Sequence, residues 1–244
     1  MLNPHATTLA ERNGGLNACG AESSPHLAIF RGPWEGDRVI LIDEATVVVD
    51  EATLLPPVTL HVDQGTWLAV RGANGAGKST LLALIAAVRT PTGGTITIDG
   101  RAPDARKKWF REQVSALLSP PVVAPDLTLH EHLTLIATSW RDADPRERAR
   151  VELERWHIAE LGQRFVHELS SGQRQLFALA TAFVRPSSVL VLDEPEQRLD
   201  AARRALLVAA LRERQDSGTT IVMATHADDV AGAANTVTWL DQID

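Results

Sequence analysis

The sequence predicts an α/β protein in which a parallel sheet is flanked by helices. The runs at 189–192 (VLVL) and 220–224 (TIVMA) are continuously apolar and do not alternate with polar residues. Such runs are typical of strands covered on both faces, as in parallel sheets. A glycine-rich loop also separates a short apolar run from a helix-like segment, which is the order expected of α/β units.

The first part of the chain predicts short strands after an irregular start. Residues 1–37 are rich in Asn, Gly, Ser and Pro without sustained periodicity, so we expect a flexible N-terminal extension. Apolar runs then indicate strands, and Thr90-Pro91 should end a helix that follows the glycine-rich loop. The expected strands are 39–42, 47–49, 58–62, 67–71 and 95–98, and the expected helix is 78–89.

The middle third predicts a mostly helical insertion at about 103–168. Residues 104–113 are charged and helix-like, and 114–118 reads as a buried strand. Thr128 with Glu131 three residues later predicts a capping box for a helix that runs to Trp140. Asp144 and the following proline predict another helix to about residue 160.

The strand and helix pattern resumes after this insertion. A helix should run through 177–183, followed by the strand 189–192, a helix near 200–215 and the strand 220–224. No internal repeat is visible in the sequence.

Composition excludes several classes of protein. The 244 residues include 24 basic and 31 acidic side chains, and the net charge of −7 argues against a nucleic-acid partner. A single cysteine, Cys19, leaves no internal disulfide framework and fits a reducing compartment. No apolar run approaches the roughly 20 residues needed to cross a bilayer, and we expect neither a signal peptide nor a membrane span.

Residues 72–80 (GANGAGKST) fit the phosphate-loop pattern G-x-x-x-x-G-K-[ST]. Glycines permit positive φ, so the backbone N–H groups can turn toward an anion. Lys78 would reach the β- and γ-phosphates, and the Ser79 hydroxyl would bind Mg²⁺. The accidental alternative is an ordinary glycine-rich turn. The predicted nucleotide-binding residues here are Gly72, Asn74, Gly75, Gly77, Lys78, Ser79 and Thr80.

Two carboxylates, Asp193 and Glu194, directly follow the apolar run 189–192. Ligands bind at the carboxyl ends of strands in open α/β sheets. We therefore expect Asp193 to hold Mg²⁺ and Glu194 to act as the base or the orienter of the attacking water. Two ordinary acids in a surface turn are the alternative.

Taken with these motifs, the segment ELSSGQRQ makes the chain resemble the nucleotide-binding domains of ATP-binding cassette (ABC) proteins over about 38–243. Further carriers of the resemblance are VLVLDEP, Leu199-Asp200 and Ala224-Thr225-His226. The family usually has L-S-G-G-Q, so Ser171 replaces a glycine here. The resemblance implies a P-loop NTPase core, an antiparallel β subdomain and the inserted helical subdomain.

The resemblance also implies how nucleotide is bound. In this family ATP lies between the phosphate loop of one subunit and the signature helix of the other, in a homodimer or a heterodimer with a second ABC subunit. His226 matches the switch histidine that contacts the γ-phosphate, and Lys78 and Glu194 complete the catalytic set. Asp200 matches the aspartate of the dimer interface. The signature residues expected to contact ATP are Ser170, Ser171, Gly172 and Gln173.

Three departures from the family pattern affect these expectations. Ser119 stands where the family has a glutamine that touches Mg²⁺, so it is a weaker candidate metal ligand. The family has an aromatic residue for adenine stacking at the position of 49–51, and none occurs here. Phe30 or Trp34 could take its place if the N-terminal segment folds back. The run 195–198 (PEQR) replaces small residues and should add bulk and charge at the dimer seam.

The resemblance implies an ATPase subunit that lies on the inner face of the cell membrane and drives transport through separate permease subunits. A soluble cassette ATPase for assembly or repair is one alternative, although the sequence has neither long heptad repeats nor two cassettes. The other is a regulatory cassette with weak hydrolysis, which Ser119 and the missing aromatic favour. The transported substrate and the direction of transport do not follow from the sequence.

Overall fold

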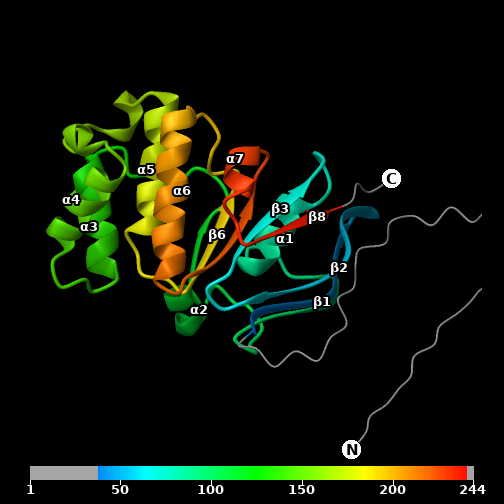
Figure 1. The fold of residues 1–244 in the computed structure, drawn as a ribbon. Coiled ribbons are helices and arrows are strands. Elements are labelled where there is room, and N and C mark those ends of the chain that lie inside the picture. Colours follow the sequence, from blue (N-terminus) through cyan, green and yellow to red (C-terminus); the bar gives the residue numbers. More distant parts are fainter. Residues whose placement is uncertain (1–37, 241–244) are drawn as a thin grey trace, which may run out of the picture. The chain divides into compact units, whose positions relative to one another are not determined.

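The computed structural model describes residues 38–240 (Figure 1). The predicted flexible extension at 1–37, together with Cys19, Phe30 and Trp34, lies outside the described residues. A helix long and apolar enough to cross a membrane does not occur between residues 38 and 240.

A five-stranded parallel sheet forms the centre of the fold and confirms the predicted α/β class. Its order is β5-β6-β7-β3-β8, and all neighbouring strands run parallel. The edge strand β8 was not predicted. Its residues alternate Thr, Val and Trp, but the segment is only five residues long and follows a helix of four residues that shows little periodicity. The strands are β3 (Trp67–Gly72), β5 (Val114–Leu117), β6 (Val189–Asp193), β7 (Thr220–Ala224) and β8 (Thr236–Leu240).

The parallel sheet separates two hydrophobic cores. Successive side chains of a strand point to opposite faces, so Ile221 and Met223 pack into one core and Val222 and Ala224 into the other. The first core lies under helices, and the second lies against α1 (Lys78–Ile85) and the antiparallel sheet. Burial on both faces explains why these strands read as unbroken apolar runs.

A second, antiparallel sheet has the order β2-β1-β4 and contains β1 (Arg38–Val49), β2 (Ala52–Asp63) and β4 (Gly93–Ile98). The prediction of two separate strands at 39–42 and 47–49 was wrong. The polar residues between them belong to the same strand, and there the pairing of β1 with β2 shifts register. Glu44 in this stretch has φ of 50°. β2 contains Pro56 and Pro57, which a strand paired on one side only can accommodate.

Helix α1 ends at Ile85, so the prediction of a helix to residue 89 was wrong. Ala87 has φ of 54°, a left-handed conformation. Its N–H donates to Leu84 O at 3.1 Å, and the N–H of Val88 donates to Ala83 O at 2.9 Å. These two bonds form a Schellman cap that ends the helix before Thr90-Pro91 is reached.

Helices α3 and α4 of the middle region lie on the side away from β1 and β2 (Figure 1), whereas Phe110 of α2 packs in the core shared with those strands. α3 begins after Thr128, whose capping box with Glu131 is present as predicted. α4 ends earlier than the predicted residue 160, since His157 has φ of 53°. β5 lies within the range 103–168 but pairs with β6 in the parallel sheet. The remaining bounds are α2 (Lys108–Gln113), α3 (Leu129–Ser139), α4 (Pro145–Arg155), η1 (Ala159–Leu161), η2 (Val166–Glu168), α5 (Ser171–Phe183), α6 (Ala201–Asp216) and α7 (Asp228–Ala231).

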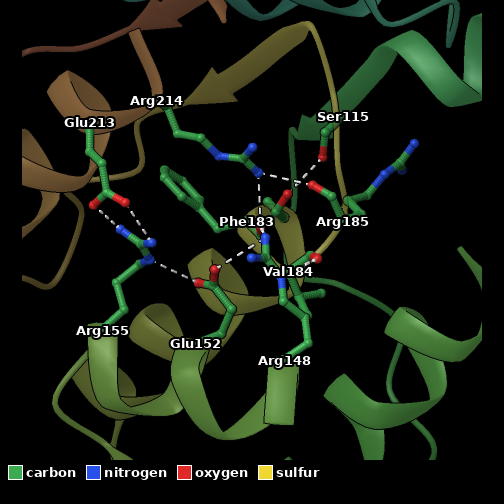
Figure 2. Close-up of polar contacts among 10 residues, drawn as sticks. Ser115, Arg148, Glu152, Arg155, Phe183, Val184, Arg185, Glu213 and Arg214 are labelled. Carbon is green, nitrogen blue, oxygen red and sulfur yellow. Dashed lines mark hydrogen bonds and ion pairs between the residues drawn. The ribbon is translucent and has the colours of Figure 1, made fainter. Parts of the chain in front are cut away.

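Arginine side chains join α4 to the C-terminus of α5 (Figure 2). Arg148 Nε donates to Val184 O at 3.1 Å, and Arg214 of α6 donates to Phe183 O at 2.8 Å. These donors satisfy carbonyl groups that have no partner at a helix end and complement its partial negative charge.

The carboxylate of Glu152 lies among these arginines and is buried (Figure 2). It forms ion pairs with Arg148 at 3.6 Å and Arg155 at 3.3 Å. Burial raises the pKa of Glu152, while the charges of Arg155, Arg148 and Arg214 lower it. α4, α5 and α6 are thus fixed to one another by a charged cluster at the end of α5 opposite Ser170.

Candidate functional site

The phosphate loop connects β3 to α1, as the sequence predicts. Gly72, Gly75 and Gly77 have φ of 147°, 86° and 90°. A Cβ on Gly77 would lie 2.9 Å from Leu54 O, and one on Gly72 would lie 2.5 Å from Leu240 O. Close backbone approach and left-handed conformation therefore both require glycine at these two positions.

Lys78 is buried within this loop and is only 6% exposed. Its Nζ donates to Gly72 O and Ala73 O, both at 2.9 Å. An ammonium group has three N–H donors, so one remains for a further acceptor. The loop thus places a positive charge at the N-terminus of α1, where an anion is also favoured by the helix dipole.

Asp193 lies at the carboxyl end of β6, beside Ser79 of α1. Burial raises the pKa of Asp193, and a hydrogen bond from Ser79 opposes this effect. Its Oδ1 is buried without a hydrogen-bond partner among residues 38–240. A buried carboxylate oxygen and a hydroxyl are oxygen ligands of the kind that Mg²⁺ prefers, so Ser79 and Asp193 fit this ion. The described part of the chain has no cluster of three or more His, Cys, Asp or Glu residues that could hold a metal by themselves.

Glu194 and His226 are in direct contact. His226 Nε2 lies 3.1 Å from Glu194 Oε1. The other oxygen of Glu194 accepts a hydrogen bond from Gln197 Nε2, and its backbone N–H donates to Ala224 O at 3.0 Å. Glu194 has φ of 45°, so it turns sharply away from β6. The structure therefore brings together the carboxylate and the histidine that the sequence predicts to be catalytic.

Glu196 corrects one prediction from the sequence. The run 195–198 was expected to add bulk and charge at the dimer seam, but the Glu196 side chain is buried within its own chain. Its Oε1 accepts hydrogen bonds from the Thr225 hydroxyl and from the backbone N–H of His226. The sequence reasoning did not identify Glu196 or Gln197 as parts of the site, although their place between Glu194 and Asp200 was a signal for it.

A cleft of about 280 Å³ is lined by several of the site residues, including Ser79, Asp193 and Glu194. Ser119 lines it, so this residue faces the same space as Ser79 and Asp193. Gln175 of α5 also lines it and donates from Nε2 to Pro195 O at 2.8 Å. The full lining is Ser79, Leu117, Leu118, Ser119, Pro120, Gln175, Ala178, Asp193, Glu194, Gln197 and Arg198.

The segment 170–173 begins α5 and does not line the cleft. Ser170 caps the helix, because its hydroxyl accepts from Gln173 N while Gln173 Oε1 accepts from Ser170 N. A Cβ on Gly172 would lie 3.1 Å from Arg198 O, so this glycine allows the helix start to approach the loop before α6. Ser171 lies in the first turn of α5.

Asp200 caps α6 by accepting from Arg203 N at 2.9 Å. The N-termini of α5 and α6 therefore lie close together, since Gly172 also approaches the side chain of Arg203. Among residues 38–240, Asp200 forms no hydrogen bond or ion pair with the phosphate loop.

Residues 49–51, where the family's adenine-stacking residue was sought, form the tip of the β1–β2 hairpin. Asp50 and Glu51 have φ of 46° and 67°, which gives a tight two-residue turn. Asn74 and Thr80 lie in the loop and in the first turn of α1, where the sequence predicts nucleotide-binding residues.

Sequence comparison finds relatives of this chain. The profile of a family described as "ABC transporter" matches residues 55–197. The Fe(3+) ions import ATP-binding protein FbpC of Brucella melitensis biotype 1 is 34% identical over 200 residues, which are 80% of this chain and 56% of that protein. The sulfate/thiosulfate import ATP-binding protein CysA of Synechococcus elongatus is 37% identical over 178 residues, or 71% of this chain and 51% of that protein. The chain thus spans about half the length of these relatives.

Solved structures share the fold. An ATP-binding subunit of an ABC transporter has a TM-score of 0.75 at 26% identity, covering 83% of this chain and 85% of that one. A dimeric ATP-binding cassette in a post-hydrolysis state bound to ADP and Pi has a TM-score of 0.75 at 23% identity, covering 84% and 97% of the two chains. These matches confirm the predicted P-loop NTPase fold with its parallel and antiparallel sheets.

Proposed function

Since this chain belongs to the ABC transporter family, we propose that it is the ATP-binding and ATP-hydrolysing subunit of a transporter. It would power movement of a substrate through separate membrane-spanning subunits. One observation carries the proposal: Ser79, Asp193 and Glu194 line one cleft. Lys78 directly precedes Ser79 in α1, and His226 contacts Glu194. The cassette would comprise 38–243, with the helical subdomain at about 103–168.

Each residue of the site would have its own role in phosphoryl transfer. Backbone N–H groups of the loop at 72–77 and the Lys78 ammonium would hold the β- and γ-phosphates. Ser79 and Asp193 would hold Mg²⁺, with Ser119, which lines the same cleft, as a further candidate ligand, and the ion would offset charge on the phosphates. Glu194 would orient the attacking water, and His226 would hold the Glu194 carboxylate and approach the γ-phosphate.

Two copies of the chain, or this chain and a second cassette, would complete each nucleotide site. Ser171 and Gly172 present N–H groups at the start of α5, and with the Ser170 hydroxyl they would form a second anion-binding helix end, whereas the N–H of Ser170 is bonded to Gln173 Oε1. That helix start does not line the cleft of its own chain, so a partner subunit would bring the matching segment to ATP. Asp200 would lie at the seam between the subunits.

The proposed location is peripheral, on the inner face of the cell membrane and bound to permease subunits. The relatives include proteins named for import of Fe(3+) ions and sulfate, and one named for macrolide export. The proposal therefore concerns the ATPase cycle that drives transport and assigns neither a substrate nor a direction.

Two measurements on the purified chain test this function. Wild type should release phosphate from ATP and Mg²⁺ at steady state, whereas Glu194→Gln should fall to about 1% of that rate or below. Sedimentation of Glu194→Gln with ATP should show a dimer, while the same variant without ATP stays monomeric. Equal, near-background phosphate release by both proteins would contradict the proposal and favour a regulatory cassette.

The link to transport needs a separate experiment. A tagged chain purified from its host membranes should carry a polytopic membrane protein with it. Absence of any such partner from solubilised membranes would contradict the transporter role but not the ATPase.

A further inference from the structure

Glu196 is the most unusual polar side chain next to the proposed site. It is 8% exposed, and its Oε2 is buried without a hydrogen-bond partner in the part of the chain that the structure describes. Burial of a carboxylate costs free energy unless hydrogen bonds compensate. The compensating hydrogen bonds are all made by Oε1, so the partners of this oxygen fix the position of the Glu196 side chain.

Oε1 of Glu196 accepts two hydrogen bonds from the segment that follows β7. One comes from the hydroxyl of Thr225, which is fully buried, and the other from the backbone N–H of His226 at 3.0 Å. The Thr225 oxygen in turn accepts from Ala227 N at 3.1 Å. A single carboxylate thus fixes three consecutive residues, with His226 in the middle.

The loop after β6 is bound to the end of β7 and to the loop after it in two further places. Glu194 N–H donates to Ala224 O, and the Glu194 carboxylate meets His226 Nε2 at 3.1 Å. Glu196 lies two residues beyond Glu194, so the two loops are joined at the backbone and at both side chains. Displacement of the His226 backbone would therefore change the contact between His226 and Glu194.

We propose that Glu196 is a positioning residue, which holds the backbone of His226 so that the imidazole stays on the Glu194 carboxylate. The catalytic consequence of this inference rests on the proposed ATPase function. The hydrogen bonds of Glu196 to Thr225 and His226, which we call the tie, do not involve nucleotide. A shorter side chain at 196 cannot reach Thr225 and His226 together. The loop at 225–227 would keep the bonds from Thr225 N to Val70 O and from Arg71 to His226 O, but it would lose those to Glu196. The histidine would then leave Glu194 more often.

Steady-state kinetics test the catalytic consequence. Glu196→Ala should lower kcat for ATP hydrolysis about 10-fold or more and change KM for ATP by less than about 3-fold, because Glu196 does not line the cleft. Glu196→Gln keeps the Oε1 acceptor and should recover most of kcat. Should the alanine variant fail to fold, Glu196→Thr, which is short but polar, replaces it.

A double-mutant cycle separates positioning from general damage to the fold. If Glu196 acts through the histidine, Glu196→Ala should have almost no further effect on kcat in a His226→Ala background. An equal loss of kcat in both backgrounds would overturn the inference, as would an unchanged kcat in folded Glu196→Ala. A wild type without hydrolysis would instead overturn the proposed function, and with it the catalytic role.

Amide hydrogen exchange tests the tie without nucleotide. The backbone N–H of His226 should exchange slowly in wild type and in Glu196→Gln, and at least about 10-fold faster in Glu196→Ala. The amide of Ile221, inside β7 and bonded to Thr66 O at 2.9 Å, is the control that should not change. Unchanged exchange at His226 in Glu196→Ala would overturn the inference whatever the kinetics show.

Discussion

His226 Nε2 lies 3.1 Å from Oε1 of Glu194, although the two residues belong to loops that follow different strands. Adjacent parallel strands bring these loops together, since β6 and β7 pair with Asp193 opposite Ala224. The contact therefore follows from the sheet register.

Removal of the imidazole should separate catalysis from binding. We expect His226→Ala to lower kcat for ATP hydrolysis on the order of 100-fold, because Glu194 loses the group that orients it. KM for ATP should change by less than about 3-fold. His157→Asn is the control, since this exposed histidine with positive φ is replaced by a residue that tolerates that conformation. A loss of similar size in both variants would contradict the role of His226.

Lys78→Ala should abolish tight nucleotide binding. The variant removes the buried ammonium and the two bonds that it makes to Gly72 O and Ala73 O. Isothermal titration with ATP and Mg²⁺ should show at least a 100-fold rise in Kd. Lys108→Ala, an exposed lysine paired with Glu112, should bind ATP like wild type. Wild-type affinity in Lys78→Ala would refute the phosphate-loop assignment.

Asp193→Asn should raise thermal stability at neutral pH, although it removes a proposed Mg²⁺ ligand. Burial raises the pKa of Asp193 in the folded state. A carboxyl group with a raised folded pKa costs stability once the pH exceeds its unfolded value, so the cost is present at pH 7 and disappears in acid. Tm without nucleotide should therefore be higher for Asp193→Asn at pH 7, and the difference should shrink as the pH falls through the raised folded pKa and vanish below the unfolded value of about 4. A lower Tm for the variant at pH 7 would contradict this account.

The charged cluster around Glu152 should contribute strongly to stability. Glu152→Ala leaves Arg148, Arg155 and Arg214 without their shared buried carboxylate, which typically costs about 3–5 kcal/mol of unfolding free energy. Glu147→Ala on the exposed face of α4 removes a pair with Arg150 and should cost less than about 1 kcal/mol. Urea unfolding of both variants is the measurement. Equal midpoints would show that the cluster around Glu152 is no more important than a surface pair.

Local sequence signals predicted much of the fold. The glycine spacing at 72–77, the capping box at Thr128 and the apolar strands at 189–192 and 220–224 each depend on neighbouring residues alone. The end of α1 was missed because an alanine, rather than a glycine, takes the left-handed position at Ala87. A propensity scale does not reveal that exception.

The candidate site was predicted less completely than the fold. Phosphate-loop and strand-end residues were identified because their types and spacing imply chemistry. The tie between Glu196 and Thr225 joins residues 29 positions apart, and it depends on the pairing of β6 with β7. From the sequence, Glu196 was predicted to add charge at the dimer seam, because its contact with Thr225 leaves no local signal.

The two prolines of β2 also bear on how the protein behaves when it is concentrated. β2 is the outer strand of the antiparallel sheet, and Pro56 and Pro57 have no N–H to offer. A strand of another molecule that paired with this edge would lack hydrogen-bond donors at the proline positions, and this discourages fibril-like assembly. Replacement of both prolines by valine would therefore remove a built-in safeguard against aggregation.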